Sequence, residues 1–356
     1  MFRSILVPLG YGRRVASSDV ARSLSLTRRD ALLALLGVSA ALAGCTRGAP
    51  PVQEPLAERP NSTPSTPATA SGSPSPTPQG TSQAAAIELA LADLAGATLS
   101  GRQRTQLTSA QRDLLAAVRG GHLDHATALR SPEPTSRPEP TSTTSPRPGT
   151  LAPKKAIAAL IKQERSAADR HAKTAQGSTG FDALLWASMS VAASSYASAL
   201  VAGKAHAIET SPRNQLPELS EPDAISELVA QLHALVYGYQ LAIGKLRVLS
   251  KAHARAVAEL RSIRVLRDRL VAILAARSTD APVPQAAYVP SVRVHDAESA
   301  GQLIEQMQSA LLPYCGLFLA AAANGSNRNL AFDTLASTAA TARSWGAPLI
   351  AWPGWP

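Results

Sequence analysis

The sequence predicts an all-α protein with a four-helix bundle in its C-terminal part. Two observations indicate this. Of 356 residues, 45% are hydrophobic but only 4% are aromatic. Much of the apolar share is alanine, which favours helices whose backbones approach closely. After residue 219, apolar residues recur at alternating spacings of four and three, which is typical of helices that bury one face.

The first 45 residues are typical of an export signal. Arg28 and Arg29 precede an apolar run at residues 31–43. The tetrapeptide Leu42-Ala43-Gly44-Cys45 closes this segment. This run has 13 residues, whereas a membrane-spanning helix needs about 20. We therefore expect a signal peptide over residues 1–44 and no permanent transmembrane anchor.

This signal resembles that of bacterial lipoproteins exported by the twin-arginine route. The resemblance implies a lipobox at residues 42–45 and a diacylglycerol on Cys45, which would anchor the mature chain to the extracytoplasmic face of the cell membrane. Two alternatives stay open. The cysteine can follow an ordinary signal peptide by chance, and the arginine pair can be the basic start of a general export signal.

The next segment, residues 45–82, is rich in proline, serine and threonine and has no apolar periodicity. We expect a disordered tether there. A second tract of the same composition, at residues 131–150, interrupts a helical region at residues 83–210. Within this region we expect a Gly/Ser break at residues 96–101 and helices at residues 83–95, 102–129, 153–176 and 181–203.

The bundle over residues 220–346 has the most regular pattern. Ser220 is expected to cap its first helix and Asp296 its third, while the second runs to about residue 277 and the fourth covers about residues 328–345. Pro313 lies inside the third helix, where its missing backbone donor predicts a kink. A tail rich in tryptophan and proline follows at residues 347–356.

Several stretches of this part are distinctive: HALVYGYQLA at 233–242, RDRL at 267–270, AAYVPSV at 286–292, the helix containing LIEQMQSALLPYCG, and the ending ARSWGAPLIAWPGWP. They resemble domain of unknown function 4439, a ferritin-like family of actinobacterial lipoproteins. The resemblance covers about residues 220–356. It implies a ferritin-like bundle and supplies no established activity.

A di-iron centre in such a bundle needs a glutamate from each of two helices and Glu-x-x-His from each of the other two. In this chain no aspartate or glutamate is followed three residues later by histidine. We therefore expect no metal ion, cofactor or catalytic residue in the bundle. The cysteine of its third helix, Cys315, is interpreted as a small core residue.

Histidines in the preceding region offer one grouping with metal-binding character. His122 and His125 share a helical face beside Asp124, and His171 lies on a later helix. Three imidazole nitrogens can hold a metal ion. The interpretation that the sequence favours is simpler: surface histidines near the glycine-rich end of a helix, with no metal.

Charge indicates possible partners. The net charge is +10, and residues 1–44 carry six arginines against two aspartates, which leaves +6 for the rest. A cluster of cations occurs at Lys245, Arg247, Lys251, Arg255, Arg261, Arg264, Arg267 and Arg269. It suits anionic lipid headgroups or a cell-wall polymer, and we expect no nucleic acid partner. The alternative is a solvated helix face.

The C-terminal tryptophans, Trp345, Trp352 and Trp355, suit a membrane interface, a partner protein, or a cover over the end of the bundle. From these features we expect a lipid-anchored binding or structural component of the cell envelope that is not an enzyme. Two other classes stay open. One is an envelope metalloprotein for metal storage or redox chemistry, with His122, His125 and His171 as its ligands, and the other is a carrier of an apolar ligand.

Overall fold

The computed structural model describes residues 78–101, 104–130, 151–203, 208–209 and 216–356. All of them fall in one compact unit that includes residues 72–356. The described residues form eight α-helices and two short strands, so the all-α prediction is confirmed. The expected signal peptide, Cys45 and the linker at residues 131–150 lie outside them.

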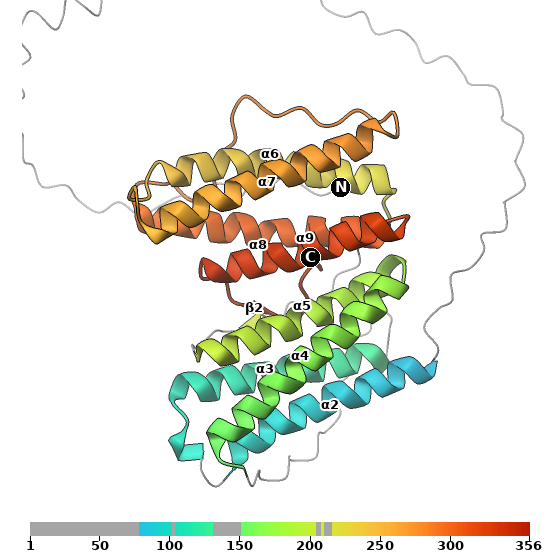
Figure 1. Cartoon of the computed structure of the whole chain (residues 1–356), viewed down its shortest axis with the longest axis vertical. Helices are drawn as coiled ribbons and strands as arrows, with labels where there is room; N and C mark the ends of the chain where they lie inside the picture. Colours follow the sequence, from blue (N-terminus) through green and yellow to red (C-terminus); the bar gives the residue numbers. More distant parts are fainter. Residues whose placement is uncertain (1–77, 102–103, 131–150, 204–207, 210–215) are drawn as a thin grey trace, which may run out of the picture. The chain divides into compact units, whose positions relative to one another are not determined.

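Four helices form the N-terminal bundle (Figure 1): α2 (Pro78–Ser100), α3 (Ser109–Arg130), α4 (Pro153–Gly177) and α5 (Gly180–Ala202). A 3-10 turn, η1 (Arg104–Gln106), connects α2 to α3. Helix α2 contacts α3 and α4, and α4 contacts α5 along its length.

Helix α2 differs from the sequence-based expectation at both ends. It begins at Pro78, inside the range assigned to the tether, and it continues through Gly96 to Ser100. Proline is tolerated in a first helical turn, because the backbone N–H groups of that turn make no hydrogen bond within the helix. A glycine inside a helix costs about 1 kcal/mol. Burial of the flanking Ala95 and Thr98, which are 0% and 6% exposed, offsets that cost.

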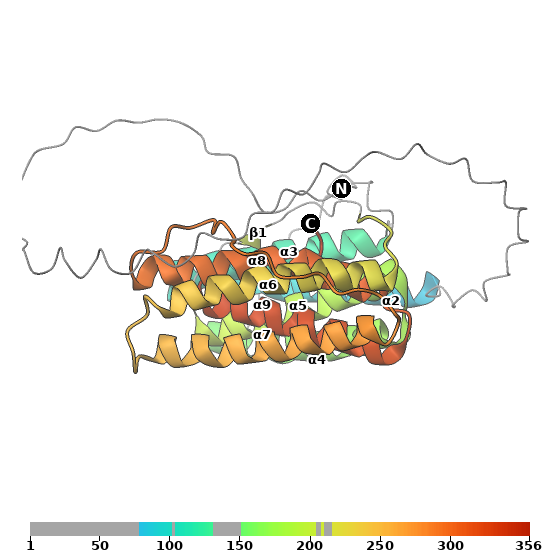
Figure 2. The same ribbon diagram turned by 90° about the horizontal axis from the view of Figure 1, so that it is seen from above.

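Helix α5 is the central element of the unit. It contacts α3 and α4 on one side and α8 and α9 on the other. Among the described residues it is the helix long and apolar enough to cross a membrane, but 83% of its apolar window is buried inside the protein. A helix that is apolar on all sides is typical of a protein core, and Figure 2 shows α5 among the other helices.

The C-terminal bundle consists of α6 (Glu221–Ile243), α7 (Lys251–Ala275), α8 (Ala297–Ala321) and α9 (Gly325–Ser344). Both expected caps are present: the Ser220 hydroxyl accepts from the Asp223 amide, and Asp296 forms a reciprocal capping box with Ser299. Asn324 caps α9, since its side chain accepts from the Asn327 amide.

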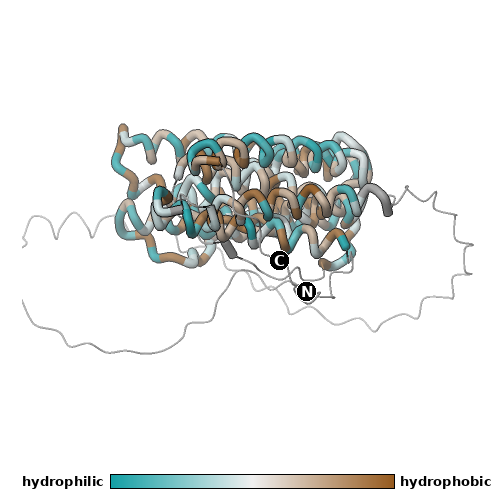
Figure 3. Tube along the Cα trace, turned by 90° about the horizontal axis from the view of Figure 1, so that it is seen from below, coloured by the Kyte–Doolittle hydropathy of each residue, from teal (hydrophilic) through white to brown (hydrophobic). Residues whose placement is uncertain are grey.

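Apolar side chains connect the two bundles. One buried cluster reaches from Ala84 and Ala128 through α5 to the cores of α6, α8 and α9. A second cluster fills the N-terminal bundle and includes Leu114, Leu160 and Tyr196. Figure 3 shows hydrophobic and hydrophilic residues alternating along much of the trace, as expected where a helix buries one face.

The C-terminal tail packs inside the unit. Its strand β2 (Leu349–Ile350) pairs in parallel with β1 (Ile208–Glu209), and Trp352 and Trp355 are 5% and 9% exposed. The Ser188 hydroxyl of α5 donates to the carbonyl of Pro353. Of the three roles that the sequence left open for the tail, the structure therefore shows a cover, but one that reaches the N-terminal bundle.

Candidate metal centre

Five buried ionisable side chains converge in the N-terminal bundle. They come from three helices: Glu88 from α2, His122 and His125 from α3, and Glu164 and His171 from α4. None of the five is more than 2% exposed. The prediction that the histidines lie on the surface is therefore wrong. The glycines beside them do not end the helix, because α3 continues to Arg130.

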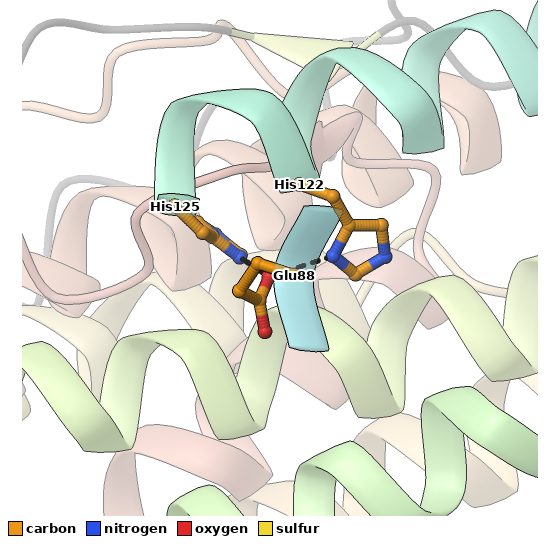
Figure 4. A group of neighbouring side chains, drawn as sticks. All are labelled: Glu88, His122 and His125. Carbon is orange, nitrogen blue, oxygen red and sulfur yellow. Dashed lines mark hydrogen bonds and ion pairs between the residues drawn. The ribbon is translucent and has the colours of Figure 1, made fainter. Parts of the chain in front are cut away.

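The Glu88 carboxylate is the centre of the group (Figure 4). Its Oε2 lies 2.7 Å from Nδ1 of His122 and 2.9 Å from Nδ1 of His125. Its Oε1 lies 2.7 Å from Nε2 of His171. Three imidazole nitrogens thus contact one carboxylate.

The outer nitrogens of the two α3 histidines meet acceptors. Nε2 of His122 lies 2.7 Å from Oε1 of Glu164, and Nε2 of His125 lies 2.8 Å from the backbone oxygen of Ala351 in the tail. A carbonyl oxygen only accepts, so Nε2 of His125 carries its hydrogen and donates. In the neutral ring, Nδ1 then presents a lone pair to Glu88, and a cation is needed between these two acceptors.

Two buried carboxylates with three neutral imidazoles carry a net charge of −2, which is costly without compensation. Burial opposes a charged His122, but Glu164 and Glu88 outweigh it and raise the pKa of His122 to about 10. Burial also opposes ionisation of Glu88, yet hydrogen bonds from the three histidines hold its pKa well below the ordinary value. The metal-free group is thus stabilised by protons.

Aromatic rings enclose the group. Tyr196 lies edge-on to His122 with the ring centroids 5.4 Å apart, Trp352 lies edge-on to His125 at 4.7 Å, and Trp186 stacks on His171 at 5.6 Å. The Tyr196 hydroxyl is buried and has no hydrogen-bond partner among the described residues. These walls exclude water, so the polar groups interact in a low-dielectric environment.

The donor set fits a first-row divalent metal ion. Imidazole nitrogens and one carboxylate suit zinc, iron, copper or nickel, whereas calcium and magnesium prefer oxygen alone. Ligand atoms of Glu88, His122 and His125 all lie within 4.8 Å of one another. Ligands about 2.0 Å from a tetrahedral ion are about 3.3 Å apart, so metal entry would open the present contacts by roughly 0.5 Å.

Histidine ligands in metal sites usually donate their second nitrogen to a carboxylate or a backbone carbonyl. Glu164 and the Ala351 carbonyl occupy these two positions for His122 and His125. The described residues therefore supply ligands together with the groups that orient them.

Glu88 and Glu164 were missed in the sequence, although a signal exists. Glu88 interrupts a helical stripe of buried apolar residues formed by Ala84, Ala85, Leu91 and Ala92, and Glu164 stands between Leu160 and Ala167 in the same way. A single carboxylate on an otherwise apolar helix face has no local partner, which indicates one on another helix.

In the C-terminal bundle, the ligand-poor interior has a different network. The Gln308 amide donates to the Tyr239 hydroxyl, which donates to Glu259. The indole of Trp345 donates to the same carboxylate. One glutamate, with two neutral donors and the Arg255 guanidinium beside it, does not fit the four carboxylates of a di-iron centre, and the metal-capable group found among the described residues lies in the other bundle.

The cation cluster spans the loop after α6 and helix α7. Helix α7 begins at Lys251, so Arg247 precedes it in the connecting loop and does not share a helical stripe with Lys251 and Arg255. The guanidinium of Arg255 lies 3.8 Å from the ring centre of Trp345 and donates to the Ser344 carbonyl. Arg255 therefore joins two helices, whereas Lys251, Arg261, Arg264 and Arg269 are exposed.

The C-terminal region is similar to a known protein family. Residues 224–356 match a family described as "Domain of unknown function (DUF4439)". The metal-capable ligands all precede this match. No curated protein matched the chain. A crystal structure of a conserved hypothetical protein, rv2844, from Mycobacterium tuberculosis is similar at 24% identity; the match covers 35% of this chain and 93% of that one, with a TM-score of 0.34.

Proposed function

We propose that the N-terminal bundle binds one divalent transition-metal ion through Glu88, His122, His125 and His171. One observation carries this proposal: three imidazole nitrogens lie 2.7–2.9 Å from the oxygens of one fully buried carboxylate. Without a metal ion, protons have to occupy these contacts, because otherwise the lone pairs of nitrogen and oxygen would face each other. A divalent ion offsets the −2 charge of Glu88 and Glu164 with the histidines neutral.

Zinc is the ion that this donor set suits best. Glu88, His122 and His125 already lie close enough together to share an ion, and His171, which contacts the other oxygen of Glu88, would have to move closer to become the fourth ligand. A complete shell of four protein ligands is typical of structural or storage sites, whereas catalytic zinc keeps an open position. No described residue supplies a thiolate near the group, and thiolate would favour copper(I). We therefore propose a metal-holding function and not metal-dependent catalysis.

The test is elemental analysis of residues 46–356 after incubation with zinc, iron(II) and manganese(II) and removal of free metal. We expect about one zinc ion per chain, and none in the His122→Ala/His125→Ala variant. The His295→Ala variant, which changes an exposed histidine, should retain the metal. A folded wild-type chain that holds no metal would make the group a buried polar network only.

We also propose that the chain is exported and anchored by a lipid on Cys45, so that it holds its metal in the cell envelope. The arginine pair, the short apolar run and the lipobox support this proposal. In cells, Cys45→Ser should move the protein from the membrane to the soluble fraction and remove the mass of the diacylglycerol. Membrane retention of that variant, with no lipid on the wild-type chain, would contradict the anchor.

A second candidate, a carrier of an apolar ligand, has one observation in its favour. A cleft of about 310 Å³ lies between α6, α8 and the segment before α8, with Tyr237, Tyr288, Val289 and Met307 in its walls. Mass spectrometry of the organic extract of the purified protein tests it. A stoichiometric apolar molecule that is lost in Gly238→Leu would support a carrier.

A further inference from the structure

The loop between α6 and α7 exposes two large aliphatic side chains at its tip. Val248 is 68% exposed and Leu249 is 97% exposed. The loop lies beyond the ends of the two helices, on the left in Figure 2. Apolar side chains that are nearly free of protein contact contribute little to the core, so the fold does not account for them.

Hydrogen bonds hold the backbone of this loop at both ends. Leu246 is buried at 6% exposure, and its amide bonds to carbonyls of α6. The Ser250 amide donates to the Arg247 carbonyl, and the Ser250 hydroxyl caps α7 by accepting from the His253 amide. Val248 and Leu249 are therefore presented by a hydrogen-bonded turn whose two ends are anchored.

The backbone of Leu249 is strained, because its φ is 68°. This left-handed conformation is unfavourable for a side chain with a Cβ and is usually occupied by glycine. Glycine would adopt this conformation without strain, and the leucine side chain makes no packing contacts that offset the strain. Strain retained without a stabilising contact points to a function of the side chain outside the fold.

Cations flank the aliphatic tip. Lys245, Arg247 and Lys251 are exposed, and no acidic residue occurs between Glu227 and Glu259. The start of α8 lies at the same end of the bundle, because the start of α6 bonds to residues just beyond the end of α8. It adds exposed acidic residues, Asp296 and Glu298, and the exposed cation Arg293. Positive charge therefore prevails around the tip.

We propose that this loop docks on an anionic lipid surface. Its aliphatic side chains would enter the boundary between headgroups and acyl chains, and its cations would contact the phosphates. A cell-wall polymer would attract the cations, but it offers no apolar environment in which an exposed Val-Leu pair could be buried. The proposal does not depend on metal binding, and it holds for the chain without a lipid on Cys45.

The experiment is sedimentation of residues 46–356 with large vesicles of phosphatidylcholine containing 30% phosphatidylglycerol, compared with phosphatidylcholine alone. We expect binding to the anionic vesicles that weakens with salt. Val248→Ser/Leu249→Ser should weaken it at least tenfold. Lys245→Gln/Arg247→Gln/Lys251→Gln should weaken it about 100-fold, since each cation near the surface contributes about fivefold.

Matched controls separate the loop from general surface properties. Val265→Ser removes an equally exposed valine from the middle of α7, and Arg261→Gln/Arg264→Gln/Arg269→Gln removes the same charge from exposed positions of that helix. Both should bind within about threefold of the wild type. If either weakens binding as much as its loop counterpart, or if the wild type does not bind anionic vesicles, the proposal is wrong.

Leu249→Gly provides the sharpest variant. Glycine relieves the left-handed strain, so the variant should unfold at a higher temperature than the wild type, yet it should bind vesicles several-fold more weakly. Unchanged vesicle affinity would contradict the proposal. Binding to a soluble anionic polysaccharide that exceeds binding to vesicles, and that Val248→Ser/Leu249→Ser leaves unchanged, would assign the surface to wall polymer and also overturn it.

Discussion

The backbone carbonyl of Ala351 accepts a hydrogen bond from Nε2 of His125 over 2.8 Å, although 226 residues separate them in the sequence. The bond fixes which nitrogen of His125 carries hydrogen and turns the other toward Glu88. Ala351 lies within the residues that match the C-terminal family. The candidate metal centre thus takes its ligands from the N-terminal bundle and part of their orientation from the C-terminal tail.

Replacing the two buried glutamates should separate a ligand from an orienting group. Glu88→Gln removes the anionic oxygens that three imidazoles contact, and we expect zinc affinity to fall more than about 100-fold. Glu164→Gln still accepts from Nε2 of His122, so the loss should stay at about tenfold to 100-fold. Competition with a chromogenic chelator measures both. The exposed Glu227→Gln control should match the wild type, and equal losses in the two buried variants would contradict this division.

Zinc affinity should rise with pH. The pKa of His122 is raised to about 10, so below that pH a proton must leave the ring before a metal can bind. Displacement of one proton makes affinity rise about tenfold per pH unit between pH 7 and 9. Calorimetry in buffers of different ionisation enthalpy should detect the released proton. Affinity independent of pH in this range would show that His122 is not a ligand.

Without metal, the chain should lose stability as pH rises from about 6.5 toward 10. The raised pKa of His122 means that the folded chain holds a proton there which the unfolded chain loses above the ordinary pKa, so this contribution is complete below pH 6.5. A tenfold difference in proton affinity corresponds to about 1.4 kcal/mol, so the contribution is at most about 5 kcal/mol. Urea unfolding at several pH values measures the loss, which should vanish in His122→Gln and shrink when zinc is present.

Acidification should destabilise the metal-free chain by a separate route. The depressed pKa of Glu88 means that its contribution is present above the ordinary carboxyl pKa and is lost as pH falls through the folded value. The unfolding midpoint should therefore decline below about pH 4.5. In Glu88→Gln, the unfolding midpoint should depend less on pH in this acidic range. An unchanged dependence in that variant would show that Glu88 is not the group responsible.

A methyl group at Gly316 should displace the tail. A Cβ there would lie 1.9 Å from the carbonyl oxygen of Gly354, a backbone atom that cannot rotate away. We expect Gly316→Ala to cost about 1 to 3 kcal/mol of unfolding free energy and to weaken zinc binding, because the Ala351 carbonyl moves with the tail. Gly120→Ala meets open space in α3 and should instead stabilise the chain by about 0.5 to 1 kcal/mol.

The thiol of Cys315 should be unreactive in the folded chain. Burial raises its pKa to about 12, and the thiolate is the reactive form. A thiol reagent at pH 8 should label residues 46–356 only after urea is added, at which point one thiol per chain reacts. Rapid labelling without urea would show that α8 opens readily.

The sequence predicted the helices better than the site. Ser220 and Asp296 are local signals, since a cap lies three residues from the amide that it binds, and both helices begin where expected. The contact of Glu88 with His171 joins α2 to α4 across 83 residues, and no local pattern encodes that distance. The local sequence pattern therefore indicates the histidines but not the carboxylate that they contact.

Gly121 shows why the histidines looked exposed in the sequence. A glycine pair beside them indicated a weakened helix end. In the structure, a Cβ on Gly121 would lie 2.2 Å from the Tyr196 hydroxyl oxygen, so this glycine admits the tyrosine ring of α5 next to His122. The glycine serves close packing in a buried site, which only the neighbouring helix reveals.

The buried tail has a consequence for the study of the C-terminal domain on its own. Trp352 and Trp355 are covered in the intact unit, and both lie within residues 224–356. A fragment cut at the start of this match would lose α5, including Ser188, which bonds to the tail, and would expose two indole rings to water. Self-association of such a fragment would then be an artefact of where the chain was cut.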